Sequence, residues 1–185
     1  NYNPFLPSTL LHAGLQQIGF ESLFYYNYET SQLEPWQAES YQFNDAFDEV
    51  TIKLRPGIAW SDGEPFTAND IVYTMNMLKA NAPALGTWSV NVKTWIKDIA
   101  AVDDRTVKIT LTSANPRFIL DTFGVRIYGV TFILPEHVWK DKDPLTFNNF
   151  DIAKGWPVST SPYRLVGSNA TETTWDRRDD WWGAK

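Results

Sequence analysis

The side chains in this sequence that could do acid–base or metal chemistry are two histidines, His12 and His137, and 22 acidic residues. The histidines lie far apart in the sequence, and neither belongs to an H-E-x-x-H or another metal-ligand spacing. A surface or capping role is a more common outcome for such residues than ligation of a metal. A glycosidase-type carboxylate pair is compatible with so many acids, although solvated or ion-paired carboxylates are far more frequent. We expect no metal and no cofactor.

Motifs for covalent or nucleotide chemistry are also missing from the sequence. There is no G-x-S-x-G elbow, P-loop or G-x-G-x-x-G fingerprint, which are the usual signs of a hydrolase, an NTPase or a dinucleotide enzyme. Cysteine is absent, which excludes disulfides, thiolate metal sites and a cysteine nucleophile within these residues. The sequence therefore predicts a protein that is not an enzyme.

Aromatic residues are the unusual feature of the composition, with nine Trp, eight Tyr and eleven Phe. Large flat side chains fill cores first, so burial is the default interpretation of each one. Trp88, however, follows Pro83 in a weakly patterned, glycine-containing segment that we interpret as a loop, where a core role is least expected. For Trp88, and with it Trp95, a ligand-facing position and a place in the core both remain open.

Length and charge narrow the class of protein. With 185 residues, 43% hydrophobic and 21% charged, the chain can form a globular core in one large or two small domains. The net charge is −6 and no run of Lys or Arg forms a basic stripe, so nucleic acid and anionic membranes are not expected partners. The apolar stretches are too short to cross a bilayer. The chain starts at Asn1 without a leader, so we expect that any signal segment has been removed or left out.

Hydrophobic periodicity predicts short strands mixed with short helices. Alternation over 50–54 indicates a strand with one exposed face, and an apolar stripe at helical spacing indicates a helix from Ala68 to about Ala82, capped by Thr67. Further predicted helices cover 11–18 and 115–124 and begin at Pro135, and further predicted strands cover 22–28, 99–102, 107–111, 163–166 and 173–177. Because the order lacks a strict βαβ rhythm, the predicted class is α+β.

Several segments resemble one protein family in their order and spacing. They are Asn3-Pro-Phe and residues 33–40 (LEPWQAES), 52–73 (IKLRPGIAWSDGEPFTANDIVY), 102–107 (VDDRTV), 134–139 (LPEHVW), 161–165 (SPYRL) and 178–183 (RDDWWG). Together they are similar to the family 5 extracellular solute-binding proteins, the receptors for peptides, nickel or oligosaccharides that serve ABC importers. The block 52–73 is the most specific of these segments, and its pattern of strand, turn, Trp60 and capped helix indicates scaffold rather than binding site.

The resemblance implies an N-terminal fragment of a two-lobed fold like that of the periplasmic binding proteins, class II with the family's extra domain, built from a mixed sheet and short helices. Residues 1–28 would begin the first lobe, 29–154 would form the extra domain, and 155–185 would re-enter the first lobe, with the second lobe absent. The implied protein is a lipoprotein on the periplasmic or extracellular face of the cell membrane. It would be a monomer that partners ABC permease subunits and touches the membrane only through a lipid anchor outside this fragment.

The same resemblance places the segment after the first proline against the ligand, so the predicted ligand contacts are Ser8, Thr9, Leu10 and His12, together with Trp88 and Trp95. This segment has no carboxylate, which weakens recognition of a peptide amino terminus. The aromatic content favours an oligosaccharide over a peptide. A second departure from the family pattern is Ser159-Thr-Ser161 in place of Gly-Thr-Gly, which questions a glycine-dependent backbone near the hinge.

Two other classes of protein remain open. A carbohydrate-binding β-sandwich module or a glycosidase fragment would present several exposed tryptophans in a row on an all-β platform. A chaperone-like or signalling receptor would share the fold without transport. Because the fragment holds only one wall of the cleft, we expect this chain alone to bind ligand weakly or not at all.

Overall fold

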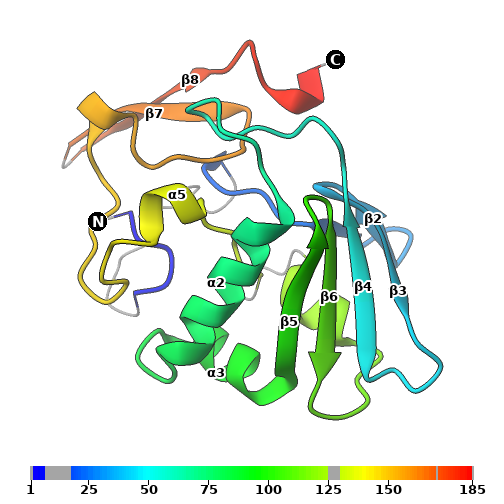
Figure 1. Cartoon of the computed structure of the whole chain (residues 1–185). Helices are drawn as coiled ribbons and strands as arrows, with labels where there is room; N and C mark the ends of the chain where they lie inside the picture. Colours follow the sequence, from blue (N-terminus) through cyan, green and yellow to red (C-terminus); the bar gives the residue numbers. More distant parts are fainter. Residues whose placement is uncertain (1, 7–17, 125–129, 170, 185) are drawn as a thin grey trace.

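Alternating apolar and polar residues form the central strands of a four-stranded antiparallel sheet. In the computed structural model, which describes residues 2–6, 18–124, 130–169 and 171–184, this sheet has the order β3-β4-β6-β5 (Figure 1). Its strands are β3 (Ala38–Phe43), β4 (Glu49–Leu54), β6 (Thr106–Leu111) and β5 (Ile96–Asp103). Ile52 pairs with Tyr41 on one side and with Val107 on the other, which places the apolar side chains of β4 and β6 on one face. The predicted strand at 50–54 and the predicted hairpin after it are confirmed.

The apolar face of the sheet is covered by helices, and α2 (Ala68–Ala80) begins where the sequence predicts. The carboxylate of Asp70 accepts the backbone N–H of Thr67 at 2.8 Å, which satisfies one of the free donors at the start of the helix. The helix ends at Ala80, slightly before the predicted end, because the N–H of Asn81 closes the last turn on the carbonyls of Met77 and Leu78.

A second helix, α3 (Gly86–Trp95), occupies the segment that the sequence indicates as a loop. Only Ser89 and Val92 of this helix are buried, so it lacks the apolar stripe by which a helix is recognised in a sequence. It lies beside α2 and is followed directly by β5 (Figure 1). Packing against its neighbours therefore stabilises α3 where its own pattern gives little support.

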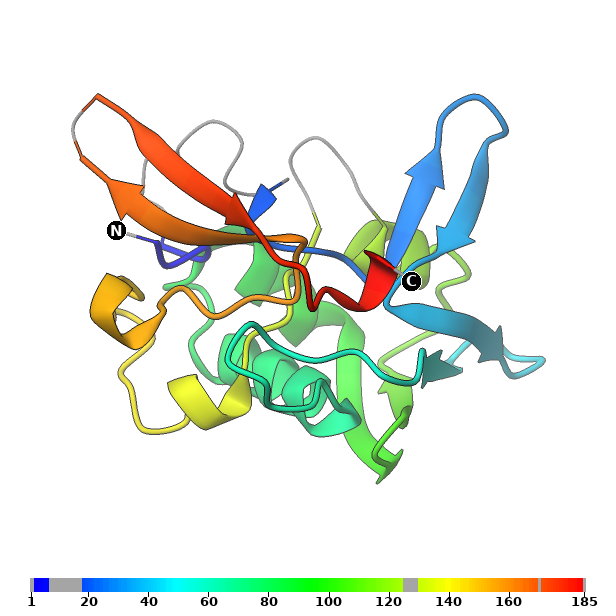
Figure 2. The same ribbon diagram turned by 90° about the horizontal axis from the view of Figure 1, so that it is seen from above.

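Two hairpins extend from the same side of the molecule (Figure 2). One pairs β1 (Phe24–Asn27) with β2 (Gln32–Pro35), and the other pairs β7 (Tyr163–Ser168) with β8 (Thr173–Arg177). Short helices complete the fold: α4 (Phe118–Phe123), α5 (Glu136–Trp139), and the 3₁₀ helices η1 (Ile152–Lys154) and η2 (Trp182–Ala184). The α+β class is confirmed. The predicted helix at 11–18 lies outside the described residues except for Ile18, which is helical.

Strand pairing in the described ranges is antiparallel, apart from one parallel bridge between Phe24 and Gly124. A single cluster of buried apolar side chains runs from Tyr2 to Leu165 and joins the sheet, the helices and the hairpins. Within the same ranges, no helix has both the length and the apolar character needed to span a bilayer.

The block 52–73 folds as the predicted strand, turn and helix. Trp60 is 1% exposed, and its indole N–H donates to Asp70 Oδ2 at 3.3 Å. Its backbone N–H donates to the carbonyl oxygen of Glu64 at 2.8 Å, which closes the turn between the strand and α2. The ring thus fills the space between the turn and the start of the helix, and burying such a ring contributes about 2–3 kcal/mol.

A buried guanidinium ties this block to the end of the chain. Arg178 directly follows β8 and is 4% exposed. It donates to the carbonyl oxygens of Ser159 at 3.3 Å, Ser161 at 3.2 Å and Trp60 at 3.3 Å. It also binds the carboxylate of Asp180 through Nε at 3.2 Å and Nη2 at 3.1 Å. One side chain therefore satisfies carbonyl groups from two distant segments, which the five N–H donors of arginine make possible.

The Ser159-Thr-Ser161 segment does not need glycine. Non-glycine residues with positive φ in the described ranges are Ser31, Phe47 and Asn149, so this segment has ordinary backbone angles. Both serines are buried, and their hydroxyl oxygens lie 3.2 Å apart. The expected conflict with a glycine-dependent conformation is therefore absent at these three positions.

One bulky residue does adopt a left-handed backbone conformation. Phe47, in the turn between β3 and β4, has φ of 55° and a side chain that is 45% exposed. The turn is closed by the N–H of Phe47 on the carbonyl of Asn44 at 3.1 Å, and the N–H of Asn115 donates to the carbonyl of Phe47 at 2.8 Å. For a residue with a Cβ, this conformation costs about 1–2 kcal/mol.

We expect Arg178→Met to lower the free energy of unfolding by about 2–4 kcal/mol, because the buried carbonyl groups lose their charged donor. Urea unfolding followed by tryptophan fluorescence measures this change. The neighbouring variant Arg177→Met is the matched control, because Arg177 is exposed and pairs only at the surface with Asp179 at 2.9 Å. It should change stability by no more than about 0.5 kcal/mol. Equal effects of the two substitutions would contradict the role given to Arg178.

Candidate functional site

Trp88 is the predicted ligand contact that the structure describes most fully. It lies in the first turn of α3 and is half-buried. Its indole N–H donates to the carbonyl oxygen of Val130 at 2.9 Å, and its ring meets Phe5 edge-on, with centroids 5.9 Å apart. The hydrogen bond and the contact fix the orientation of the ring, so Trp88 can offer a ligand an apolar surface but no free donor.

Trp88 contacts a residue that borders the predicted binding segment. This residue, Phe5, precedes the segment in the sequence, and it is fully buried. Ser8, Thr9, Leu10 and His12 themselves lie outside the described residues. The hydrogen bond and the ring contact of Trp88 with described residues involve no charged side chain.

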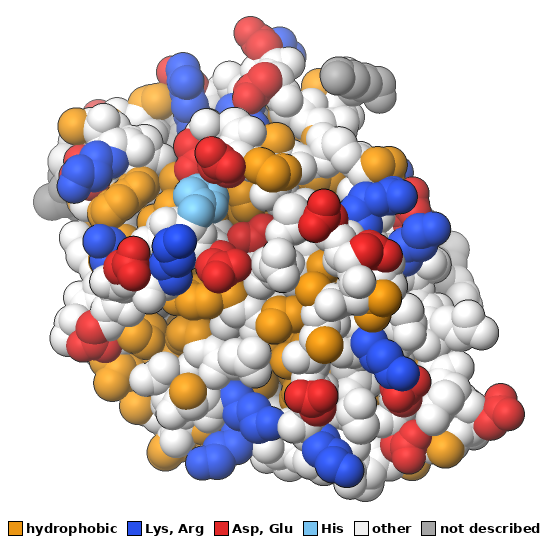
Figure 3. Space-filling view, viewed as in Figure 1, with side chains coloured by type: hydrophobic (Ala, Val, Ile, Leu, Met, Phe, Trp, Pro, Cys, Tyr) orange, Lys and Arg blue, Asp and Glu red, His pale blue; other side chains and the backbone are white. Residues whose placement is uncertain are grey.

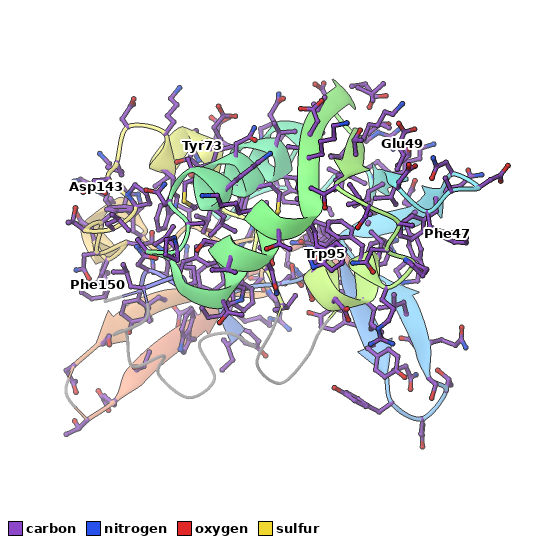
Figure 4. The ribbon with its side chains drawn as sticks, turned by 90° about the horizontal axis from the view of Figure 1, so that it is seen from below. Phe47, Glu49, Tyr73, Trp95, Asp143 and Phe150 are labelled. Carbon is purple, nitrogen blue, oxygen red and sulfur yellow. The ribbon has the colours of Figure 1, made fainter. Side chains whose placement is uncertain are left out.

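Trp95 is the last residue of α3 and follows Trp88 by two helical turns, so the two rings lie on the same side of the helix, about 10 Å apart along its axis. Trp95 is half-buried against the core, and its carbonyl accepts the N–H of Thr112 at 3.0 Å. Figure 4 shows it beside α4. The structure thus places both predicted tryptophans on one helix, with different neighbours for each ring.

A buried carboxylate for which the sequence predicts no role lies among tryptophans. Glu21 is 6% exposed, and its two oxygens accept the indole N–H groups of Trp36 at 2.9 Å and Trp182 at 3.1 Å. Burial raises the pKa of Glu21, and the indole hydrogen bonds oppose that shift. Burial and the nearby charge of Glu21 together raise the pKa of Tyr25 to about 12.

We call Trp36, Trp181 and Trp182 the tryptophan cluster. The ring centroid of Trp36 lies 5.3 Å from that of Trp182 and 6.1 Å from that of Trp181, and the latter two lie 5.4 Å apart. Gly183 lies close beside them, and a Cβ at this position would require the ring of Trp181 to shift. The signal for this cluster was present in the segments 33–40 and 178–183, but their spacing does not reveal that they meet.

His137 and Asp70 have structural partners. The Nε2 atom of His137, on α5, lies 2.7 Å from Asp62 Oδ2 at the surface. Acidic and basic side chains are interspersed over the face of the molecule that Figure 3 shows. Asp70 is 4% exposed, and burial raises its pKa while its bonds to the N–H groups of Thr67 and Glu136 and to the indole of Trp60 oppose the shift. In the described part of the chain, no three His, Cys, Asp or Glu side chains form a group that could hold a metal.

Two hollows in the described surface lie apart from Trp88. One of about 520 Å³ lies between the β7–β8 hairpin and the end of the chain and is lined by Pro162, Tyr163, Arg177, Arg178, Asp179, Trp181 and Ala184. The other, of about 360 Å³, lies on the outer face of α2 and is lined by Asn69, Val72, Tyr73, Asn76, Met77 and Glu136. Burial, Glu136 and Asp141 raise the pKa of Tyr73 to about 12. The guanidinium N–H groups of Arg178 all donate to carbonyl and carboxylate oxygens of the protein. Arg178 therefore has no N–H donor left for a ligand in the first hollow.

Comparison with known proteins gives one consistent family. The family model described as bacterial extracellular solute-binding proteins, family 5, middle region, matches residues 32–185. A probable peptide-binding protein, YejA of Agrobacterium fabrum, is 30% identical over 150 residues, which cover 79% of this chain and 23% of that protein. The glutathione-binding protein GsiB of Shigella flexneri is 29% identical over 92% of this chain and 30% of its own length.

Solved structures agree with this result. A periplasmic oligopeptide-binding protein of Thermotoga maritima is 29% identical and superposes with a TM-score of 0.81 over 99% of this chain and 32% of its own. The same protein has been solved with mannohexaose bound, and that structure gives a TM-score of 0.79. The chain therefore spans between 23% and 32% of the length of these relatives.

We expect the stability of the chain to fall as pH rises from about 4.5 through the pKa of Glu21. In this interval the unfolded chain releases the proton near its usual pKa of 4.5, whereas the folded chain still holds it. Ionisation therefore favours the unfolded state. The contribution of Glu21 is fully present below pH 4.5 and is lost above the folded pKa.

Urea unfolding of the wild type and Glu21→Gln at a series of pH values measures this effect. Asp70 titrates in the same direction, so the informative quantity is the difference between the two proteins. The wild type should lose stability relative to the variant as pH rises. Parallel pH profiles of the two proteins would show that Glu21 does not titrate differently in the folded and unfolded states.

Proposed function

This chain belongs to the family 5 extracellular solute-binding proteins, and on that premise we propose that the whole protein is the receptor of an ABC importer that captures a small oligomer, an oligosaccharide or a peptide. The observation that carries the proposal is the family match over 32–185 together with the TM-score of 0.81 over 99% of the chain. In this mechanism, ligand enters an open cleft, two lobes close around it, and the membrane permease recognises the closed form.

We propose the division into residues 1–28, 29–154 and 155–185 as two segments of the first lobe around an extra domain. Contacts between the outer segments support it. The hydroxyl of Tyr2 donates to Ser168 Oγ at 2.6 Å, and Glu21 accepts from Trp182 across 161 residues. The two ends of the chain therefore pack together while the intervening residues form the sheet and its helices.

The proposed binding wall is the side of Trp88. Ser8, Thr9 and Leu10 would contribute backbone hydrogen bonds, with His12 in the same segment. Trp88 and Trp95 would add apolar surface, and the fixed ring of Trp88 supports this use because its donor is already satisfied. Apolar aromatic surface suits the faces of sugar rings, which favours an oligosaccharide; the mannohexaose-bound relative supports the same preference.

The family consists of solute-binding proteins rather than enzymes, and we propose that this chain likewise performs no catalysis. We place the whole protein in the periplasm or at the extracellular face of the membrane, as a monomer, with ABC permease subunits as partners. A lipid anchor outside these residues would provide any attachment to the membrane. A carbohydrate-binding module or glycosidase fragment is a weaker alternative, because α2 and α3 cover the sheet where an all-β platform would have strands.

Isothermal titration of the full-length protein with cello- and xylo-oligosaccharides and with tri- to pentapeptides tests the ligand class. We expect heat of binding with at least one oligosaccharide and a dissociation constant in the micromolar range, which corresponds to a binding free energy of about −8 kcal/mol. If only peptides bind, the proposed oligosaccharide ligand is wrong but the proposed receptor function stands. The absence of binding by either class would remove the proposed function.

We also expect the 185-residue chain alone to bind the best ligand at least about a thousandfold more weakly than the full-length protein, because a single wall leaves most of the ligand surface in water. The same titration measures this difference, and circular dichroism of the chain confirms that it is folded. A dissociation constant tighter than about 1 mM for the chain would contradict the assignment of the site to a cleft between two lobes.

A further inference from the structure

Phe47 is held exposed in a conformation that does not favour it. Its φ of 55° lies in the left-handed region, where a turn of this kind accommodates glycine most easily, and its ring is 45% exposed. Because the side chain is partly exposed, its burial stabilises the fold only a little, whereas the left-handed backbone conformation lowers the stability of the fold. Strained positions of this kind are enriched at functional sites, so the surface around Phe47 is a candidate for a second site.

The ring of Phe47 ends a row of aromatic side chains, which we call the aromatic row: Phe24, Tyr41, Phe43 and Phe47. Successive ring centroids lie 5.3, 6.0 and 5.6 Å apart. Phe24 is 1% exposed, whereas Tyr41 is 39% exposed, so the row leads from the core to the surface. Figure 4 shows Phe47 and Glu49 on the β3–β4 side of the molecule, away from Trp95. The row therefore lies apart from the proposed ligand wall.

The aromatic row runs along a strand with a free edge. β3 is the outermost strand of its sheet and pairs only with β4 among the described residues. A bulge between Ala38 and Ser40 interrupts the start of this strand, but 40–43 pair regularly with β4. The outer backbone groups of such a strand can pair with an added extended segment.

The negative charge of the β3–β4 turn favours an added segment that carries basic residues. Asp45 and Asp48 are exposed on either side of Phe47, and the carboxylate of Asp48 accepts a hydrogen bond from the neutral amide of Asn44 at 2.7 Å. Glu49, by contrast, is neutralised by Lys108 at 2.9 Å. No Lys or Arg is paired with Asp45 or Asp48 in the described part of the chain. An approaching segment with basic residues would therefore meet complementary charge.

The angles between the rings disfavour a sugar chain at this place. Tyr41 and Phe43 meet at 83°, and Phe43 and Phe47 meet at 48°. Sugar rings stack on aromatic faces that are presented side by side, and the aromatic row offers edges and tilted faces instead. Apolar side chains of a peptide fit between such rings more readily.

We propose that the aromatic row, the edge of β3 and the two aspartates at 45 and 48 form a docking site for an extended segment of a protein partner in which apolar and basic residues alternate. Apolar side chains contact Tyr41, Phe43 and Phe47, and basic side chains reach the aspartates. The backbone of the segment pairs with the free edge of β3. The site is separate from solute capture, so it does not depend on the proposed ligand.

A capped heptapeptide of alternating lysine and valine, titrated into the ¹⁵N-labelled chain, tests the proposal. We expect amide shifts concentrated in 40–48 and about tenfold weaker binding of the matching glutamate–valine peptide. Phe47→Gly should reduce affinity for the lysine peptide about fivefold or more and should raise the urea midpoint, because it removes the ring and relieves the backbone. Tyr28→Ser is the matched control, since Tyr28 is 66% exposed and lies outside the row; it should leave affinity unchanged.

Several results would overturn the proposal. Undiminished binding by Phe47→Gly, equal binding of the two peptides, or shifts located away from 40–48 would each remove the site. A lower urea midpoint for Phe47→Gly would show that Phe47 serves the fold, and the argument from strain would fail. If mannohexaose shifts the amide signals of 40–48 and the lysine peptide does not, the site binds a glycan and the proposed protein partner is wrong.

Discussion

The fold depends on the buried guanidinium of Arg178. A charge removed from water is stable only where its hydrogen-bonding groups are satisfied, and Arg178 meets this condition with the carbonyls of Ser159, Ser161 and Trp60 and the carboxylate of Asp180. Because arginine stays protonated at every physiological pH, this connection between distant segments does not vary with acidity. Trp60 in turn supports Asp70 at the start of α2, so the helix and the sheet beneath it are positioned by the same contact.

Four indole N–H groups also connect segments of the fold. Trp36 and Trp182 donate to Glu21, Trp60 donates to Asp70, and Trp88 donates to the carbonyl of Val130. Each ring combines a large apolar surface with a single donor, so it can be buried and still fix the direction of a contact. These four tryptophans therefore join segments in addition to filling space in and around the core. This use of Trp88 is compatible with a ligand contact through the face of its ring.

The sequence predicts those elements whose pattern lies within a few neighbouring residues. It does not predict contacts between residues that are far apart in the chain. The alternation at 50–54, the turn at Trp60 and the capped start of α2 all lie within one short block, and each could be read from neighbouring residues. α3 was missed because only Ser89 and Val92 are buried, which leaves no helical stripe. The pairing of Glu21 with Trp182 joins residues 161 positions apart, and no spacing rule predicts it. Four of the predicted ligand contacts, at 8–12, lie outside the described residues, so they stay predictions.

Gly183 shows how a residue without a side chain can specify a structure. A larger residue would require a shift of the indole of Trp181, which packs against Trp36 and Trp182 near the buried Glu21. Gly183 is exposed, so this constraint comes from a neighbour in the chain and not from the core. A position at the surface can thus be limited in size by the ring that lies two residues before it.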